Sequence, residues 1–175
     1  MSKHVRCGLA LLLCVALPGA AVAEVKSVAA DGFLSEHRYQ IAATPEAAWS
    51  VLVHPERYWP EDHTWSGSRA NMTLRAEAEG CFCERWPQGS VEHGRVVMAV
   101  PGKSLRIRGS LGPLQELALT GVLSVALRPN EQGTEAVVTY RVSGDSLHQI
   151  ADFAPIVDRV IGQQFAAFAA LASEK

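Results

Sequence analysis

The amino-acid sequence predicts an α+β domain in which an antiparallel sheet of about seven strands packs against a long C-terminal helix. Two observations lead to this fold class. One strand and two short helical segments are followed by six segments that alternate apolar and polar residues between regularly spaced turns. The last long segment has the apolar stripe of an amphipathic helix, and such a helix is expected to cover the core face of the sheet.

The first 23 residues have the features of a secretory signal peptide. Lys3 and Arg6 precede an apolar run over residues 7–17, and a small-residue Ala-Val-Ala sequence ends at Ala23. An uncleaved anchor is the alternative, but the apolar run is shorter than the roughly 20 residues that span a bilayer. We therefore expect cleavage after Ala23 and a periplasmic or secreted protein.

Composition limits the classes of partner. Cleavage would remove two of the 16 basic side chains and none of the 18 acidic ones, which gives a formal charge of −4. This charge argues against binding to nucleic acid or to an anionic membrane. No later segment is long and apolar enough to span a membrane. We expect residues 24–32 to form a flexible leader and residues 33–175 to form a single domain.

The expected elements follow in order along the chain. Residues 33–42 alternate as a strand, and Thr44-Pro45-Glu46 has the N-cap, first-position proline and first-turn acid that begin a helix. A second short helical turn fits residues 55–59. Six further strands are expected at 71–78, 81–86, 91–100, 104–111, 117–127 and 135–142.

Two apolar patterns indicate which surfaces meet in the core. One face of the strand at 117–127 carries Leu117, Leu119, Leu123, Val125 and Leu127. In the final helix Pro155 fits the first turn. The apolar stripe of that helix contains Val157, Ile161, Phe165, Phe168 and Ala172. We expect this stripe to pack on the apolar face of the sheet.

Five segments carry a resemblance to a known family. They are residues 43–49 (ATPEAAW), the tryptophan segments at 59–60 and 65–67, residues 101–106 (PGKSLR) and the final helix. Over residues 33–172 the chain resembles the START-related helix-grip superfamily, also called SRPBCC. That superfamily includes pollen allergens, polyketide cyclases and heat-shock ATPase activator-like domains. The resemblance implies a helix-grip fold, in which a curved sheet wraps around the long C-terminal helix and leaves a cavity between them. Its motifs determine the fold rather than a reaction.

Cys81 and Cys83 are the cysteines that remain after cleavage. At i and i+2 of an extended strand their Cα atoms would lie roughly 6.5–7 Å apart, at or past the limit for an unstrained bridge. We therefore expect two free, packed thiols. A zinc site would need these cysteines and His93 together with His63 or Glu84, and the spacing offers an incomplete ligand set. We expect no metal and no cofactor.

The ionisable residues on apolar strands are the candidates for chemistry, because no nucleophile, phosphate-loop or metalloprotease motif occurs. Glu84, His93 and Arg95 can line the cavity, where they would orient a polar ligand group or act as acid and base. Alternatively, the face with Val96 and Met98 points inward, and His93 and Arg95 lie in solvent. The register of the hairpin decides between these alternatives.

An aromatic loop at residues 58–65 is the second candidate for the cavity. Its tryptophans either wall the cavity mouth or plug one end of the sheet as core. The candidate cavity lining is Trp59, Trp65, Glu84, His93, Arg95, Tyr140, Ile161 and Phe165.

The sequence favours a domain that binds a small hydrophobic or amphipathic molecule. The alternative is an enzyme of the cyclase or hydratase type that acts on a small apolar substrate in the same cavity, with Glu84, His93 or Asp62 as its ionisable groups. A protein-interaction domain is a third interpretation. The expected export disfavours it, because a cytosolic chaperone partner would be absent. Fold resemblance alone does not decide among them.

Overall fold

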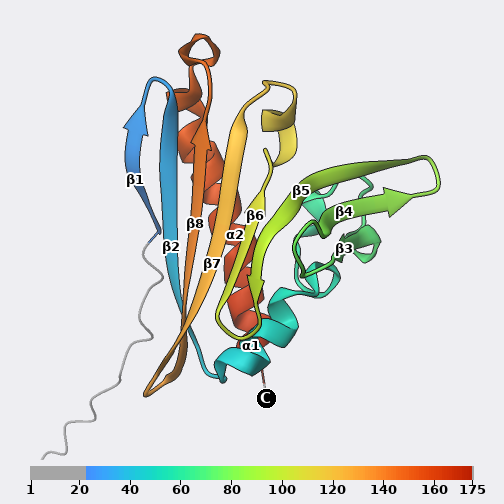
Figure 1. The fold of residues 1–175 in the computed structure, drawn as a ribbon, viewed down its shortest axis with the longest axis vertical. Coiled ribbons are helices and arrows are strands. Elements are labelled where there is room, and N and C mark those ends of the chain that lie inside the picture. Colours follow the sequence, from blue (N-terminus) through green and yellow to red (C-terminus); the bar gives the residue numbers. More distant parts are fainter. Residues whose placement is uncertain (1–22, 175) are drawn as a thin grey trace, which may run out of the picture.

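The computed structural model describes residues 23–174, which form one sheet and two α-helices (Figure 1). The strands are β1 (Ala23–Ala29), β2 (Gly32–Ile41), β3 (Met72–Leu74), β4 (Cys81–Trp86), β5 (Gly89–Val100), β6 (Ser104–Arg108), β7 (Thr120–Asn130) and β8 (Gly133–Ser143). The α-helices are α1 (Pro45–Leu52) and α2 (Ile150–Ser173). Short 3-10 turns are η1 (Pro55–Arg57), η2 (Glu61–His63), η3 (Arg69–Asn71), η4 (Gly112–Gln115) and η5 (Ser146–His148). No helix in this part of the chain is long and apolar enough to cross a membrane.

The sheet confirms the expected fold class. Its eight strands pair antiparallel in the order β1-β2-β8-β7-β6-β5-β4-β3. Helix α2 runs along one face of the sheet, and β5 curves so that β3 and β4 lean away from the central strands (Figure 1). The ladders next to β5 contain two register shifts, and bulges of this kind bend a strand. The architecture is an α+β helix-grip fold.

Residues 24–32 were expected to form a flexible leader, but most of them belong to strand β1 and to the turn that follows it. Ala30 and Asp31 form a tight turn, after which β2 pairs back on β1 from Ala29 opposite Gly32. The backbone N–H of Gly144 donates to the carbonyl of Asp31 at 3.0 Å, and Val25 packs against the core. The segment is ordered as a strand because an open edge of β2 is available to pair its backbone.

The expected signal peptide lies almost wholly outside the described residues, which begin at Ala23. Cleavage after Ala23 therefore stays a prediction.

Several element boundaries differ from the expected ones. Strand β3 is confined to Met72–Leu74, because residues 75–80 form a loop in which Glu79 has a φ of 66°. Strand β7 begins at Thr120 because η4 and the left-handed Ala118 precede it. Helix α2 begins at Ile150, so Pro155 lies inside the helix rather than in its first turn.

The apolar faces expected from the sequence do meet in the core. On β7 the side chains of Leu123, Val125 and Leu127 are buried, and on α2 those of Ile161, Phe165, Phe168 and Ala172 are buried. Tyr58, Trp59 and Phe82 add aromatic rings around Phe165 and Phe168. This packing leaves a void of only about 10 Å³, so the space between the sheet and the C-terminal half of α2 is filled.

A small polar seam also joins α2 to β2. Ser35 donates a hydrogen bond to Asp158 Oδ1 at 2.5 Å, and His37 Nε2 lies 3.0 Å from the same oxygen. Tyr39 donates to the carbonyl of Gly162 at 2.9 Å. A Cβ on Gly162 would lie 2.9 Å from the His37 ring, so glycine permits this close approach of helix and strand. We call Ser35, His37 and Asp158 the helix seam.

Candidate functional site

A β-bulge in β5 decides which side chains point into the molecule. Phe82 pairs with Gly94 and Cys83 pairs with Glu92, so His93 is an extra residue without a partner in the ladder. The bulge turns His93 inward, where it is 4% exposed, and leaves Arg95 exposed on the outer face beside Glu92. Each alternative from the sequence therefore holds for part of the strand. His93 points inward as the first alternative expects, whereas Val96 points inward and Arg95 outward as the second expects.

The bulge brings His93 against Glu84 of the neighbouring strand. His93 Nε2 lies 3.2 Å from Glu84 Oε2, and both side chains are buried. Two backbone N–H groups also donate to the carboxylate, from Trp65 at 3.1 Å and from Ser66 at 2.6 Å. Glu84 therefore fixes the aromatic loop and the histidine ring with the same two oxygens. We call His93 and Glu84 the cleft pair.

The environment sets the charge of each member of the cleft pair. Burial raises the pKa of Glu84, but hydrogen bonds from Ser66, the Trp65 backbone and His93 outweigh it, and the pKa falls below its usual range. Burial lowers the pKa of His93, and this effect exceeds the opposing effect of Glu84. The pair is thus an ionised carboxylate beside a neutral imidazole near pH 7.

His93 forms part of the wall of an open cleft of about 320 Å³. The cleft lies among three groups of residues: the aromatic loop at 58–65, the loop at 111–114 and the part of α2 from Phe153 to Gln164. Its apolar wall on α2 consists of Phe153, Ile156, Val157, Val160 and Ile161. A volume of this size and lining suits a small, mainly apolar molecule.

Gln164 adds a polar group to this mainly apolar cleft. The side chain is 4% exposed, and its Oε1 is buried without a hydrogen-bond partner among the described residues. A buried carbonyl oxygen without a partner is unfavourable, so a ligand group that donates to it would gain that hydrogen bond. The cleft therefore suits an amphipathic molecule that carries a donor such as a hydroxyl.

The tryptophans of the aromatic loop occupy two different positions. Trp59 is 3% exposed and packs edge-on against Phe82, so it belongs to the core and also forms part of the cleft wall. Trp65 is 50% exposed at the rim. Trp65 thus fits the interpretation as a wall of the cavity mouth, and Trp59 fits the interpretation as part of the core.

The other candidate residues lie at varied distances from the cleft. Ile161 lines it, whereas Glu84 lies behind His93 and Phe165 belongs to the filled aromatic core. Tyr140 donates to the carbonyl of Gly109 and accepts from the N–H of Leu111, so it supports the loop at 111–114. Arg95 does not line the cleft, because the bulge directs it to the opposite face of the sheet. Ligand binding by any of these residues stays a prediction.

Sequence reasoning missed Gln164 and the loop at 111–114. Gln164 follows Ile161 by three residues and precedes Phe168 by four, which is the spacing of one helix face. A polar residue at that position of an apolar stripe was the available signal. The loop carried no comparable signal, because only the folded chain brings it opposite α2.

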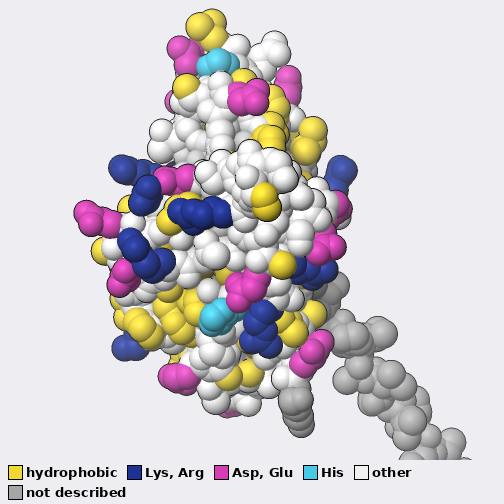
Figure 2. Space-filling view, turned by 90° about the vertical axis from the view of Figure 1, so that its right-hand side faces the viewer, with side chains coloured by type: hydrophobic (Ala, Val, Ile, Leu, Met, Phe, Trp, Pro, Cys, Tyr) yellow, Lys and Arg dark blue, Asp and Glu magenta, His cyan; other side chains and the backbone are white. Residues whose placement is uncertain are grey.

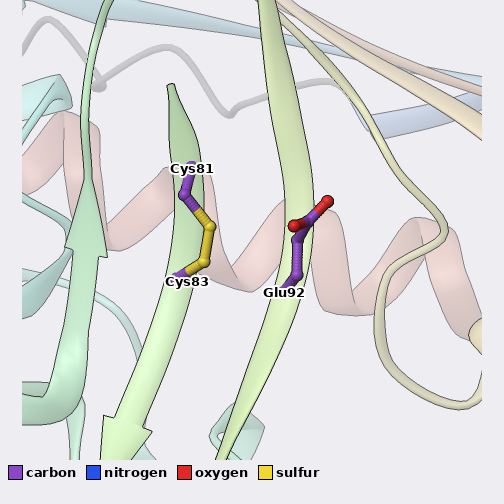
Figure 3. A group of neighbouring side chains, drawn as sticks. All are labelled: Cys81, Cys83 and Glu92. Carbon is purple, nitrogen blue, oxygen red and sulfur yellow. A yellow bond between two sulfur atoms is a disulfide. The ribbon is translucent and has the colours of Figure 1, made fainter. Parts of the chain in front are cut away.

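The expectation of free thiols at Cys81 and Cys83 is wrong, because the structure joins them in a disulfide. Their Cα atoms are 5.4 Å apart, well below the spacing of a fully extended strand and within the range of disulfides. This shortened stretch of β4 lies opposite the bulge of β5. His93 points to the other face of the sheet. Among the described residues, Glu92 is the one that places a carboxylate oxygen within 4.8 Å of both sulfurs (Figure 3).

Comparison with known proteins supports the fold and leaves the activity open. No family model matches the chain and no curated protein matches it. A protein of Rhodobacter sphaeroides has 19% identity and a TM-score of 0.56 over 86% of this chain and 97% of its own. A putative uncharacterized protein of Rhizobium leguminosarum has 13% identity and a TM-score of 0.59, over 90% and 100%. The di-domain ARO/CYC protein StfQ of the steffimycin biosynthetic pathway has 13% identity and a TM-score of 0.58, over 82% and 51%.

These likenesses show that the chain shares its fold with these proteins, including part of the di-domain ARO/CYC protein StfQ. At such identities they show a shared fold and no shared site. The class of protein is therefore a helix-grip domain with an open, mainly apolar cleft beside its long helix.

Proposed function

We propose that this protein is an exported helix-grip domain that binds a small hydrophobic or amphipathic molecule in the cleft beside α2. The single observation that carries the proposal is the combination of an open apolar cleft with the unpartnered amide oxygen of Gln164 at its wall. The likeness to StfQ, whose name includes a cyclase, supports a fold that can hold a small molecule. The filled aromatic core, which begins at Phe165, limits the ligand to the part of α2 that precedes this residue.

Export rests on the sequence of residues 1–23. N-terminal sequencing of the protein recovered from outside the cytoplasm should begin at Glu24. A mature chain that keeps Met1 would contradict the export part of the proposal and leave the cleft part standing.

Titration with the fluorescent dye anilinonaphthalenesulfonate tests binding in the cleft. The dye should bind saturably with a stoichiometry close to one, because one cleft of suitable size and lining is present. Val160→Trp should abolish binding by filling the cleft. Ala166→Trp is the matched control, because Ala166 is exposed on the same helix outside the cleft. Equal binding by both variants would show that the dye does not occupy this cleft.

The cleft pair favours a second candidate function, an enzyme of the cyclase or hydratase type. A neutral imidazole at the wall of an apolar cleft, supported by a buried carboxylate, can accept a proton from a bound substrate. This proposal requires turnover of a small β-dicarbonyl compound that His93→Gln abolishes while dye binding remains. Turnover that survives His93→Gln would remove the cleft pair from the reaction.

A further inference from the structure

The outer face of β4 and β5 carries a second concave region, which is unrelated to the proposed ligand cleft. A basin of about 310 Å³ surrounds the disulfide, and we call it the arginine basin. Its lining is Arg75, Cys81, Cys83, Arg85, Ser90, Val91, Glu92 and Arg95. Figure 3 shows the disulfide on β4 and Glu92 on the neighbouring β5, with α2 behind the strands. The side of the molecule with β3, β4 and β5 carries basic and acidic side chains among hydrophobic ones (Figure 2).

The sheet holds the two cysteines at bonding distance. Cys83 pairs with Thr73 on one side and with Glu92 on the other, and Cys81 pairs with Arg95. Because β4 is flanked by strands on both sides, reduction would leave the two sulfurs close together and ready to join again. A disulfide that closes so short a loop restricts the unfolded chain little, so its contribution as a structural staple is small.

The charges of the arginine basin favour anions and thiolates. Arg95 donates to Glu92 at 2.5 Å and Arg75 pairs with Glu77 at 2.9 Å, which neutralises part of their charge. Arg85 is exposed, and no ion pair to another described residue engages it. Guanidinium groups stabilise a neighbouring thiolate and attract carboxylates. An anionic thiol would therefore meet a favourable potential at the disulfide.

We propose that Cys81–Cys83 is a redox-active disulfide that exchanges with a low-molecular-weight thiol bearing a carboxylate. The thiolate of the reductant attacks Sγ of Cys81, which is the more exposed cysteine. The S–S bond breaks, its electron pair leaves on Sγ of Cys83, and a mixed disulfide forms. A second reductant thiolate attacks the reductant sulfur of that mixed disulfide and displaces Cys81 as a thiolate. Two reductant thiols are oxidised to their disulfide, and the two cysteines are reduced and take up the two protons.

Reduction by two thiols of different charge tests this proposal. The purified folded protein is treated with mercaptoacetate, which is anionic, or with mercaptoethanol, which is neutral. Alkylation and mass spectrometry then count thiols in the tryptic peptide that contains both cysteines. We expect two thiols to appear without unfolding, and the disulfide to form again when the oxidised form of the reductant is added. A disulfide that resists both reagents until the protein unfolds would overturn the proposal.

Variants separate the chemistry from the fold. Arg85→Gln should slow reduction by mercaptoacetate several-fold and leave the rate with mercaptoethanol unchanged. Arg141→Gln is the matched control, because Arg141 is exposed on β8, away from β4 in the sheet. Treated with the disulfide of mercaptoacetate, Cys83→Ser should exchange to a stable mixed disulfide at Cys81 and release one mercaptoacetate, whereas Cys81→Ser should leave Cys83 unreactive. Equal rates for Arg85→Gln and Arg141→Gln with mercaptoacetate, or trapping at Cys83 instead of Cys81, would contradict the proposed site.

Discussion

Two buried histidines lie beside carboxylates in this protein, and they differ in what borders the other side of the ring. His37 of the helix seam contacts Asp158 and Ser35, and Gly162 of α2 closes over it. His93 of the cleft pair contacts Glu84 on one side and forms part of the cleft wall on the other. The lining of the cleft includes no member of the helix seam. Similar residue chemistry thus serves packing at one site and faces an open cleft at the other.

The largest effect is expected from Glu84→Ala. Removal of this carboxylate leaves two backbone N–H groups and His93 without their buried acceptor. Each such loss costs about 1–3 kcal/mol, so the free energy of unfolding should fall by at least about 3 kcal/mol. Chemical denaturation followed by tryptophan fluorescence measures it.

Glu84→Gln is the conservative control for the same site. It keeps one carbonyl acceptor and should lose less stability than Glu84→Ala. A loss from Glu84→Ala below about 1 kcal/mol would mean that the cleft pair does not hold the aromatic loop in place.

The next largest loss of stability is expected from a substitution at the helix seam. Gly162→Ala places a Cβ 2.9 Å from the His37 ring and should destabilise the fold by about 1–3 kcal/mol. Dye binding in the cleft should remain, because the seam lies outside it. Ala166→Ser, on the exposed side of the same helix, is the control for changes in helix propensity. Loss of dye binding in folded Gly162→Ala would show that the two histidine sites are coupled.

The sequence predicts the features that depend on local periodicity, and it does not predict those that depend on how the strands pair. The α2 stripe and the apolar face of β7 follow from periodicity, which is local information. The cleft pair depends on the bulge at His93, and the disulfide depends on the contraction of β4 opposite that bulge. One inserted residue reverses every later side chain in a strand, so an assumed regular register misplaced Arg95. Strand β1 was missed because its mixture of small, charged and apolar residues gives no period-two pattern, and it forms a strand by pairing with β2.

A smaller effect should appear in the pH dependence of stability. Burial lowers the pKa of His93, so below about pH 6.5 the unfolded chain takes up a proton that the folded chain does not. The free energy of unfolding should therefore be constant above that pH and decline on acidification. His93→Gln should decline less steeply between about pH 6.5 and 5.

The wild type and His93→Gln differ at this ring alone, so the difference between their slopes measures its contribution. Equal slopes for His93→Gln and the wild type would assign the pH dependence to other groups.

The central claim is that the cleft holds an amphipathic molecule whose hydrogen-bond donor meets the amide of Gln164. The most direct measurement compares the dissociation constants of decanol and its methyl ether, for the wild type and for Gln164→Leu. In the wild type the alcohol should bind about 2–10-fold more tightly than the ether, which corresponds to one added hydrogen bond. In Gln164→Leu this preference should vanish while binding of the ether persists. An equal preference in both proteins, or no binding of either compound to the wild type, would contradict the account.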